Sequence, residues 1–339
     1  MGCVLALVGG LLPMAGYALV IAWLDRYERE PWLLIVGAFL WGLVPAAIAA
    51  LVSQLILDML IRSIIGEGLA AEWLQTGLVA PMTEEIAKGL AVFLVFLIFR
   101  REFDSVLDGI VYGSLVGFGF GAIENVLYLF GAYAEEGIEA LIILFILRAV
   151  LFGLNHAFFT SLIGVGLAVL RLARSQAIKL MALPVGLMLG IMAHSLHNTL
   201  VLLTAAEGGP GLAALGIALL ADWMGVLGLL ITIVLALRRE QTWIAEYLRE
   251  EVENGLLSQR HYEIACSAWR RMLAGWAALR RGDFRRYRQL GRLYHLCTRL
   301  AFKKYQQARL GEAALHQAAI ERLRQEIAAI PVGRMTHDE

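Results

Sequence analysis

The chain has 339 residues, of which 59% are hydrophobic and only 17% are charged. Soluble globular proteins carry about 25% charged residues, so this composition excludes an ordinary soluble enzyme. The hydrophobic residues gather in runs of about 20 or more, which is long enough to cross a hydrocarbon core about 30 Å thick. The composition therefore predicts an all-α polytopic membrane protein.

About seven transmembrane helices are predicted in residues 1–237. The first apolar run has its arginines after it, which is the reverse of a cleavable signal peptide, so it is counted as a span. The predicted spans are 3–24, 32–57, 73–99, 105–130, 138–170, 180–203 and 212–237.

The connecting loops alternate in their content of Lys and Arg. Loops after the first, third and fifth spans carry two or three such residues, whereas loops after the second, fourth and sixth carry one or none. Cytoplasmic loops are enriched in Lys and Arg. This pattern predicts a multi-pass protein of the cell (plasma or inner) membrane, with the N-terminus outside and the C-terminus in the cytosol.

Residues 238–339 are predicted to form a separate, basic, helical domain in the cytosol. They contain 19 Lys/Arg and 12 Asp/Glu, which leaves 10 basic and 17 acidic residues for 1–237. Two apolar stripes with helical spacing flank a break at Gly282, which predicts a hairpin of amphipathic helices. The stripes are Tyr262, Cys266, Trp269, Leu273 and Trp276, then Leu293, Leu296, Leu300 and Tyr305. The arginines around the break favour a solvated face near anionic lipid headgroups, and no nucleic-acid motif is present.

Several ionisable side chains lie inside the predicted spans, where each costs on the order of 2.5 to 3.5 kcal/mol at a helix centre. Glu85, His156 and His194 each lie 15 positions from the basic residue at the cytosolic end of their span, and Glu124 fits a similar depth. At the rise of an α-helix this is about 22 Å, in the outer half of the bilayer. Together with Glu84, these residues are expected to line one cavity.

Further polar residues in the spans are expected to support this set. Lys88 lies three or four residues from the paired glutamates and can neutralise one of them on the same helix face. Asn125, Thr160 and His197 are predicted to join neighbouring helices through hydrogen bonds. Arg148 is expected to reach the lipid headgroups or a surface glutamate.

The polar set fits two kinds of hydrolytic chemistry. A glutamate can act as a general base toward water, while the imidazoles and the amide of Asn198, one turn from His194, stabilise an oxyanion. Alternatively, Glu85, His156 and His194 can hold zinc and leave its fourth position to water. Neither an HExxH motif nor a cysteine ligand set occurs, so the spacing leaves the metal open. A proton- or ion-coupled transporter uses the same residue types and is an alternative function.

Five polar segments follow one another in order through the predicted membrane region. They are Asp25-Arg-Tyr-Glu-Arg-Glu-Pro31, Glu84-Glu-Ile-Ala-Lys88, Gly117-Phe-Gly-Phe-Gly-Ala-Ile-Glu-Asn125, His156-Ala-Phe-Phe-Thr160 and His194-Ser-Leu-His-Asn198. This ordered set resembles the PrsW family of intramembrane proteases. The resemblance implies catalytic roles for Glu84, Glu85, Glu124, His156, His194 and Asn198.

The same resemblance implies a substrate. The best-known role in the PrsW family is the first cut in a single-pass anti-sigma factor, on the extracytoplasmic side. The family is similar to the CAAX prenyl endopeptidases, which carry histidine where Glu124 stands here, so a prenyl-protein endopeptidase is a further alternative. PrsW proteins are called metalloproteases, while related enzymes are argued to use glutamate without a metal, so zinc is compatible with the resemblance but not required by it. No sequence feature indicates an oligomeric state.

Overall fold

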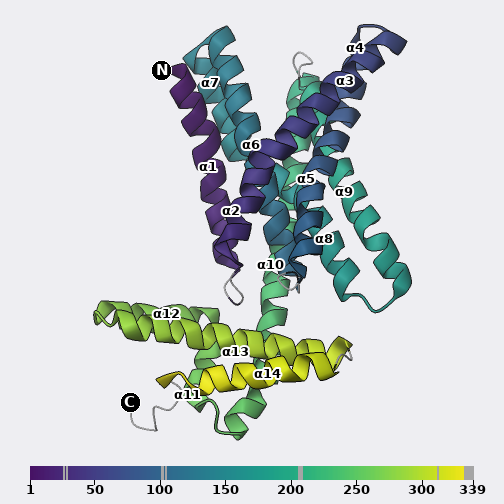
Figure 1. Cartoon of the computed structure of the whole chain (residues 1–339). Coiled ribbons are helices and arrows are strands. Elements are labelled where there is room, and N and C mark those ends of the chain that lie inside the picture. Colours follow the sequence, from purple (N-terminus) through teal and green to yellow (C-terminus); the bar gives the residue numbers. More distant parts are fainter. Residues whose placement is uncertain are drawn as a thin grey trace. The chain divides into compact units, whose positions relative to one another are not determined.

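The computed structural model describes residues 1–25, 27, 30–100, 103, 105–204, 209–310 and 313–331, without the side chains of 309, 310 and 313–316. All secondary-structure elements within these ranges are helices, as predicted (Figure 1). The chain divides into two compact units, one comprising Met1–Asp25 and Glu30–Ile233 and the other Arg26–Arg29 and Val234–Glu339. This division and the predicted domain boundary after residue 237 fall in the same helix, α10 (Gly209–Glu253).

Long apolar helices make up the first unit. They are α1 (Gly2–Leu24), α2 (Trp32–Trp41), η1 (Gly42–Ala46), α3 (Ala47–Ile65), α4 (Leu69–Leu74), η2 (Gln75–Val79), α5 (Ala80–Ile98), α6 (Val106–Glu136), α7 (Ile138–Phe145), η4 (Ile146–Leu151), α8 (Asn155–Leu172), α9 (Gln176–Leu203) and the first part of α10. The η elements are π-helical segments that continue the adjacent α-helices. Such segments are frequent at functional sites.

Six helices among the described residues are long and apolar enough to cross a membrane, which confirms a polytopic membrane protein. The remaining predicted span, 73–99, is also helical, but it is not among the six and carries three charged residues in α5. Because the predicted orientation depends on an odd number of spans, the orientation stays a prediction.

Helix α6 is the most buried helix of the first unit. In its most apolar segment 89% of the residues are buried. In the corresponding segments of the other five candidate spans, 22% to 28% are buried. The start of α6 is fixed by a capping box, in which the Ser105 hydroxyl accepts from the backbone of Asp108 and the Asp108 carboxylate accepts from the backbone N–H of Ser105. A helix anchored in this way and surrounded by others can hold side chains at a fixed depth.

Glycine allows α6 and α8 to pack backbone against backbone. Gly109 faces Gly164, and a Cβ added at Gly117 would lie 2.3 Å from the carbonyl oxygen of His156. Small residues spaced by four let membrane helices approach this closely. Because Glu124 follows Gly117 by about two turns on the same helix, this contact sets His156 beside Glu124.

We expect Gly117→Ala to lower the thermal unfolding temperature, because the new methyl group must push α8 away. Overpacking of this kind costs about 1 to 3 kcal/mol. The control is Gly131→Ala in the same helix, where an added Cβ meets nothing within 4 Å. That variant should be neutral or slightly stabilising, since alanine has the higher helix propensity. Equal unfolding temperatures for the two variants in detergent would contradict the packing account.

The second unit contains the last part of α10 and four further helices: α11 (Gln259–Ala265), α12 (Ala268–Arg280), α13 (Phe284–Leu310) and α14 (Ala313–Ala328). The predicted hairpin is present in α12 and α13, and Gly282 in its turn has a φ of +71°. Glycine adopts this left-handed conformation without steric strain.

The two apolar stripes of the hairpin differ in what covers them. The stripe on α13, with Leu293 and Leu300, is buried in the core of the unit. The stripe on α12 lies at the surface, where Trp269 and Trp276 are each more than half exposed. On α12 the opposite face packs inward at Ala278. The first predicted stripe is divided in the structure, because α11 ends at Ala265 and α12 begins at Ala268, and Tyr262 and Cys266 pack against the core. The spacing therefore identified the stripe on α13, but not the break in the first stripe or which of its side chains the core covers.

Candidate functional site

A buried lysine joins the two glutamates of α5. Lys88 Nζ lies 2.6 Å from Glu85 Oε1 and 3.6 Å from Glu84 Oε2, and its side chain has no exposed surface. The helix itself brings these residues to one face, as their spacing of three and four predicts. The ammonium also lies 4.4 Å from the ring centre of Phe120 in α6, a favourable cation–π geometry. Lys88 is therefore held by two carboxylates and an aromatic ring.

Both oxygens of Glu85 are engaged. Besides Lys88, Oε1 lies 2.9 Å from Nδ1 of His194, and Oε2 accepts a hydrogen bond from Oγ1 of Thr160 at 3.0 Å. Glu85 therefore ties α5 to both α8 and α9. The same bond fixes the ring of His194, whose Nε2 lies 3.8 Å from Glu84 Oε2.

Glu124 holds the second histidine in a similar way. Its Oε2 lies 2.6 Å from Nε2 of His156 and 2.7 Å from a terminal guanidinium nitrogen of Arg148. The Nε–H of Arg148 donates to Oδ1 of Asn125 at 3.0 Å. The other ring nitrogen of His156, Nδ1, lies 3.3 Å from Lys88 Nζ. Each histidine thus has one nitrogen beside a carboxylate that orients it.

One carboxylate oxygen of this cluster lacks a donor. Gln54 Nε2 donates to Glu84 Oε1 at 3.2 Å, whereas the buried Oε2 has no hydrogen-bond partner among the described residues. Glu84, His156 and His194 each offer one ligand atom, and the three atoms lie within 4.8 Å of one another. Tetrahedral zinc with bonds of about 2.1 Å places its ligand atoms about 3.4 Å apart. Movements of about 1 Å would therefore close the set around a metal ion.

The formal charges of the cluster also favour a cation. Three carboxylates, those of Glu84, Glu85 and Glu124, face the two cations Lys88 and Arg148. With neutral histidines one negative charge is in excess, and an uncompensated charge in this environment is costly. Two imidazoles and one carboxylate are moreover a known zinc donor set. The residues present therefore fit a metal ion.

The structure places Glu84 with the two histidines in the possible metal set, where the sequence interpretation had placed Glu85. Adjacent residues of a helix point about 100° apart, so only one of the pair can face the histidine nitrogens that are free of carboxylates. Glu85 points to Lys88, Thr160 and the opposite nitrogen of His194, as described above. That engagement is the physical reason for the difference.

Two other predicted site residues on α9 have different partners. Asn198 Nδ2 donates to the backbone oxygen of Thr76 in η2 at 3.0 Å, so this amide ties α9 to the π-helical segment. His197 Nδ1 lies 2.7 Å from Oδ2 of Asp222, which also accepts from Nδ2 of Asn155 at 2.8 Å. His197 therefore joins α8, α9 and α10, which is the helix-joining role predicted for it.

The sequence interpretation missed two members of the cluster, Gln54 and Arg148, which contact its glutamates. Gln54 could have been found as a polar side chain in a mostly apolar run. Thr160 donates from α8 to Glu85 of α5, which is the helix-joining role predicted for it. Arg148 was expected at the headgroups or on a surface glutamate. It contacts Glu124 instead, because η4 brings its guanidinium to that carboxylate.

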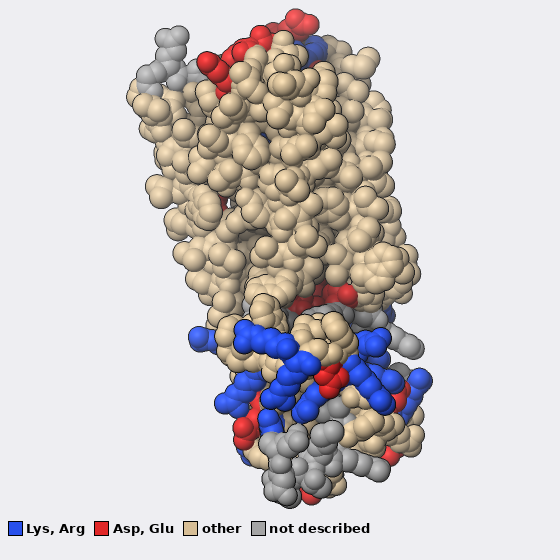
Figure 2. Space-filling model, turned by 90° about the vertical axis from the view of Figure 1, so that its left-hand side faces the viewer, with Lys and Arg blue, Asp and Glu red and all other residues tan. Residues whose placement is uncertain are grey.

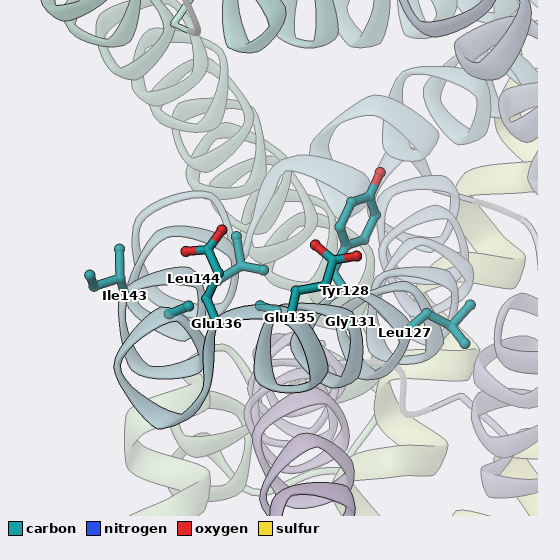
Figure 3. A pocket seen from close by; sticks show the side chains of 9 residues that line it. Leu127, Tyr128, Gly131, Glu135, Glu136, Ile143 and Leu144 are labelled. Carbon is teal, nitrogen blue, oxygen red and sulfur yellow. The ribbon is translucent and has the colours of Figure 1, made fainter.

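A separate open pocket of about 640 Å³ lies between the C-terminal half of α6 and helix α7. Figure 3 shows Tyr128, Glu135 and Glu136 directed to the same side of α6. The Arg148 guanidinium lies 4.0 Å from the ring centre of Tyr128. Through Arg148, one wall of the pocket is thus linked to Glu124.

We expect Glu84→Ala, His156→Ala and His194→Ala to lose most of the metal bound by the purified protein, measured by elemental mass spectrometry. Each change removes one of three ligands. Glu124→Gln should weaken metal affinity by about 10- to 100-fold, the usual effect of a residue that orients a ligand. His197→Ala is the matched control and should keep its metal. Equal loss in the His197 variant would contradict the assignment.

Comparisons with known proteins confirm the family resemblance. The sequence model of the PrsW family intramembrane metalloproteases matches residues 30–237, which contain the whole cluster. Protease PrsW of Geobacillus kaustophilus is 33% identical over 142 residues, which are 41% of this chain and 55% of that protein. Protease PrsW of Clostridioides difficile is 33% identical over 106 residues, 31% of this chain and 42% of that protein.

Protease PrsW of Bacillus subtilis is 30% identical over 112 residues, which are 33% of this chain and 48% of that protein. The chain thus spans about half the length of the curated relatives it matches. No solved structure matches it. Because the family match covers more than half of its residues, the chain belongs to the PrsW family of intramembrane metalloproteases.

Proposed function

We propose that this chain hydrolyses peptide bonds of single-pass membrane proteins within the bilayer, with anti-sigma factors as the substrate class. The observation that carries the proposal is the buried Oε2 of Glu84, which has no hydrogen-bond partner among the described residues and lies in one group with His156 and His194. Peptide hydrolysis requires a group that accepts a proton from water or a metal that makes water acidic. Oε2 of Glu84 can accept a proton from water or bind a metal.

Neighbouring carboxylates orient the two histidines that lie beside Glu84. Glu84, His156 and His194 would hold the metal, which when bound supplies an acidic water molecule and polarises the peptide carbonyl. Glu85 and Glu124 orient the two imidazoles, in the manner of the carboxylates behind metal-bound histidines. Where a glutamate acts as the base, Oε2 of Glu84 takes the proton of the attacking water and passes it to the leaving amine, so that the C–N bond breaks with no net proton consumed.

The topology of the reaction follows from the distribution of Lys and Arg. With the N-terminus outside, the cluster lies in the outer half of the bilayer, and the cut falls near the extracytoplasmic side of the substrate. Residues 1–237 would then form the catalytic transmembrane domain of a cell-membrane protein, and 238–339 its cytosolic domain. The family match over 30–237 supports this division of tasks.

We expect Glu84→Gln to reduce cleavage by about 100- to 10,000-fold, because it removes proton acceptance and a ligand oxygen while preserving side-chain volume. Glu85→Gln disturbs the orientation of His194 and removes the buried ion pair with Lys88, so it should lower the unfolding temperature and reduce cleavage by the folded protein by about 10- to 100-fold. The measurement is cleavage of a reconstituted single-pass anti-sigma factor, with a prenylated CAAX peptide as the alternative substrate.

The control for both variants is Glu139→Gln, which alters an exposed glutamate of α7 and should leave cleavage unchanged. Chelation should abolish cleavage by the wild-type protein, and added zinc should restore it. Full activity in both glutamine variants of the pair would refute the role of the cluster. Cleavage of the prenylated peptide alone would refute the proposed substrate class.

A further inference from the structure

The outer face of α12 is apolar although it lies at the surface of the second unit. Trp269, Leu273 and Trp276 are 59%, 49% and 57% exposed. Their spacing of four and three residues places them side by side on one face of the helix. Exposed tryptophans at this spacing form a continuous apolar ridge, which is unusual for a surface that contacts only water.

A different face of α12, opposite the ridge, packs against the core of the unit. On the opposite side of α12, Ala278 is buried and Arg271 points inward, where its Nε donates to the Ala265 carbonyl at 2.8 Å and a terminal nitrogen donates to Thr298 at 2.8 Å. The inward face of α12 is thus packed against the rest of the unit. The ridge is the face directed away from the unit.

Arginines without ion-pair partners adjoin the ridge. From α12 to the end of α13 the sequence has twelve Lys or Arg residues and a single acidic residue, Asp283. Arg280, Arg281 and Arg285 are exposed, and no carboxylate of a described residue pairs with them. By contrast, Arg324 on α14 is bound to Glu251 at 2.8 Å. Figure 2 shows the Lys and Arg side chains gathered on the C-terminal helices, in contrast to the mostly uncharged visible face of the first unit.

We propose that the ridge Trp269–Leu273–Trp276 and the adjoining arginines, here called the hairpin surface, bind the anionic headgroup region of a lipid bilayer. Aromatic and aliphatic side chains on one face of a helix, bordered by arginines, are the signature of helices that lie in the membrane interface. The apolar ridge enters the acyl boundary, and the guanidinium groups pair with lipid phosphates.

The covalent connection of the hairpin to the first unit also favours lipid over a soluble partner. Helix α10 runs without a break from the apolar first unit into the second, so a bilayer is always present at high effective concentration. A nucleic acid would gain from the arginines but would not bury the aliphatic Leu273. A second copy of this surface would bring like charges together.

The test uses the full-length protein in nanodiscs, with a polarity-sensitive fluorophore at Ala277→Cys, an exposed position beside Trp276. The native exposed thiol is removed by Cys3→Ser. The partly exposed Cys266 is changed to serine as well, whereas Cys297 is buried and its burial raises the pKa of the thiol to about 12. In discs containing phosphatidylglycerol we expect blue-shifted emission and quenching by brominated acyl chains.

Two triple variants distinguish binding by the hairpin surface from a general effect of the positive charge of the second unit. Arg280→Gln, Arg281→Gln and Arg285→Gln together should weaken docking by roughly 100-fold, because each arginine near an anionic membrane contributes about fivefold. The matched triple variant Arg249→Gln, Arg260→Gln and Arg322→Gln removes three exposed arginines from α10, α11 and α14 and should dock as the parent does. The thermal unfolding temperature serves as a check that the protein stays folded in every variant.

Other outcomes would overturn the proposal. Equal blue shifts in discs of phosphatidylcholine alone would remove the role of anionic lipid. The same shift in detergent, dependent on protein concentration, would assign the ridge to a second copy of the chain. Protection of the label by RNA, with no response to lipid, would assign it to nucleic acid. None of these readouts depends on cleavage, so the failure of the proposed protease activity would leave this test unaffected.

Discussion

The buried ion pair between Lys88 and Glu85 is the interaction on which the site depends. Neither side chain has exposed surface, and their charged atoms are 2.6 Å apart. Removing one partner of such a pair leaves the other as an unpaired buried charge, which costs about 3 to 5 kcal/mol. Glu85 is also the carboxylate that holds His194, so α5 and α9 are joined by the same charge. The pair therefore stabilises the fold and orients a site residue at once.

The second constraint is the close packing of α6 against α8. Its glycines permit an approach at which no Cβ fits, and this approach brings His156 to Glu124. The two histidines thus reach one site by different means, one through a buried ion pair and the other through backbone packing. A change in either contact should move only one of the histidines directly.

The sequence predicted which residues meet but not how each is used. Depth counting on separate spans was enough to place Glu85, His156 and His194 together, because helical rise is nearly constant. It could not choose between Glu84 and Glu85, since that choice depends on the rotation of α5 about its axis. The partner of Arg148 could not be predicted either, because a long flexible side chain near a π-helical segment can contact several carboxylates.

The second unit illustrates another limit of periodicity. An apolar stripe shows that one face of a helix avoids water. It does not show whether protein or lipid covers that face. On α13 the cover is the core of the unit, whereas the stripe of α12 has no cover within it. In a soluble protein such a stripe would suggest a protein partner. In a chain whose other unit is built for a bilayer, lipid is an apolar phase that is always nearby. The arginines beside the stripe, with which no carboxylate of a described residue pairs, supply the charge that anionic headgroups require.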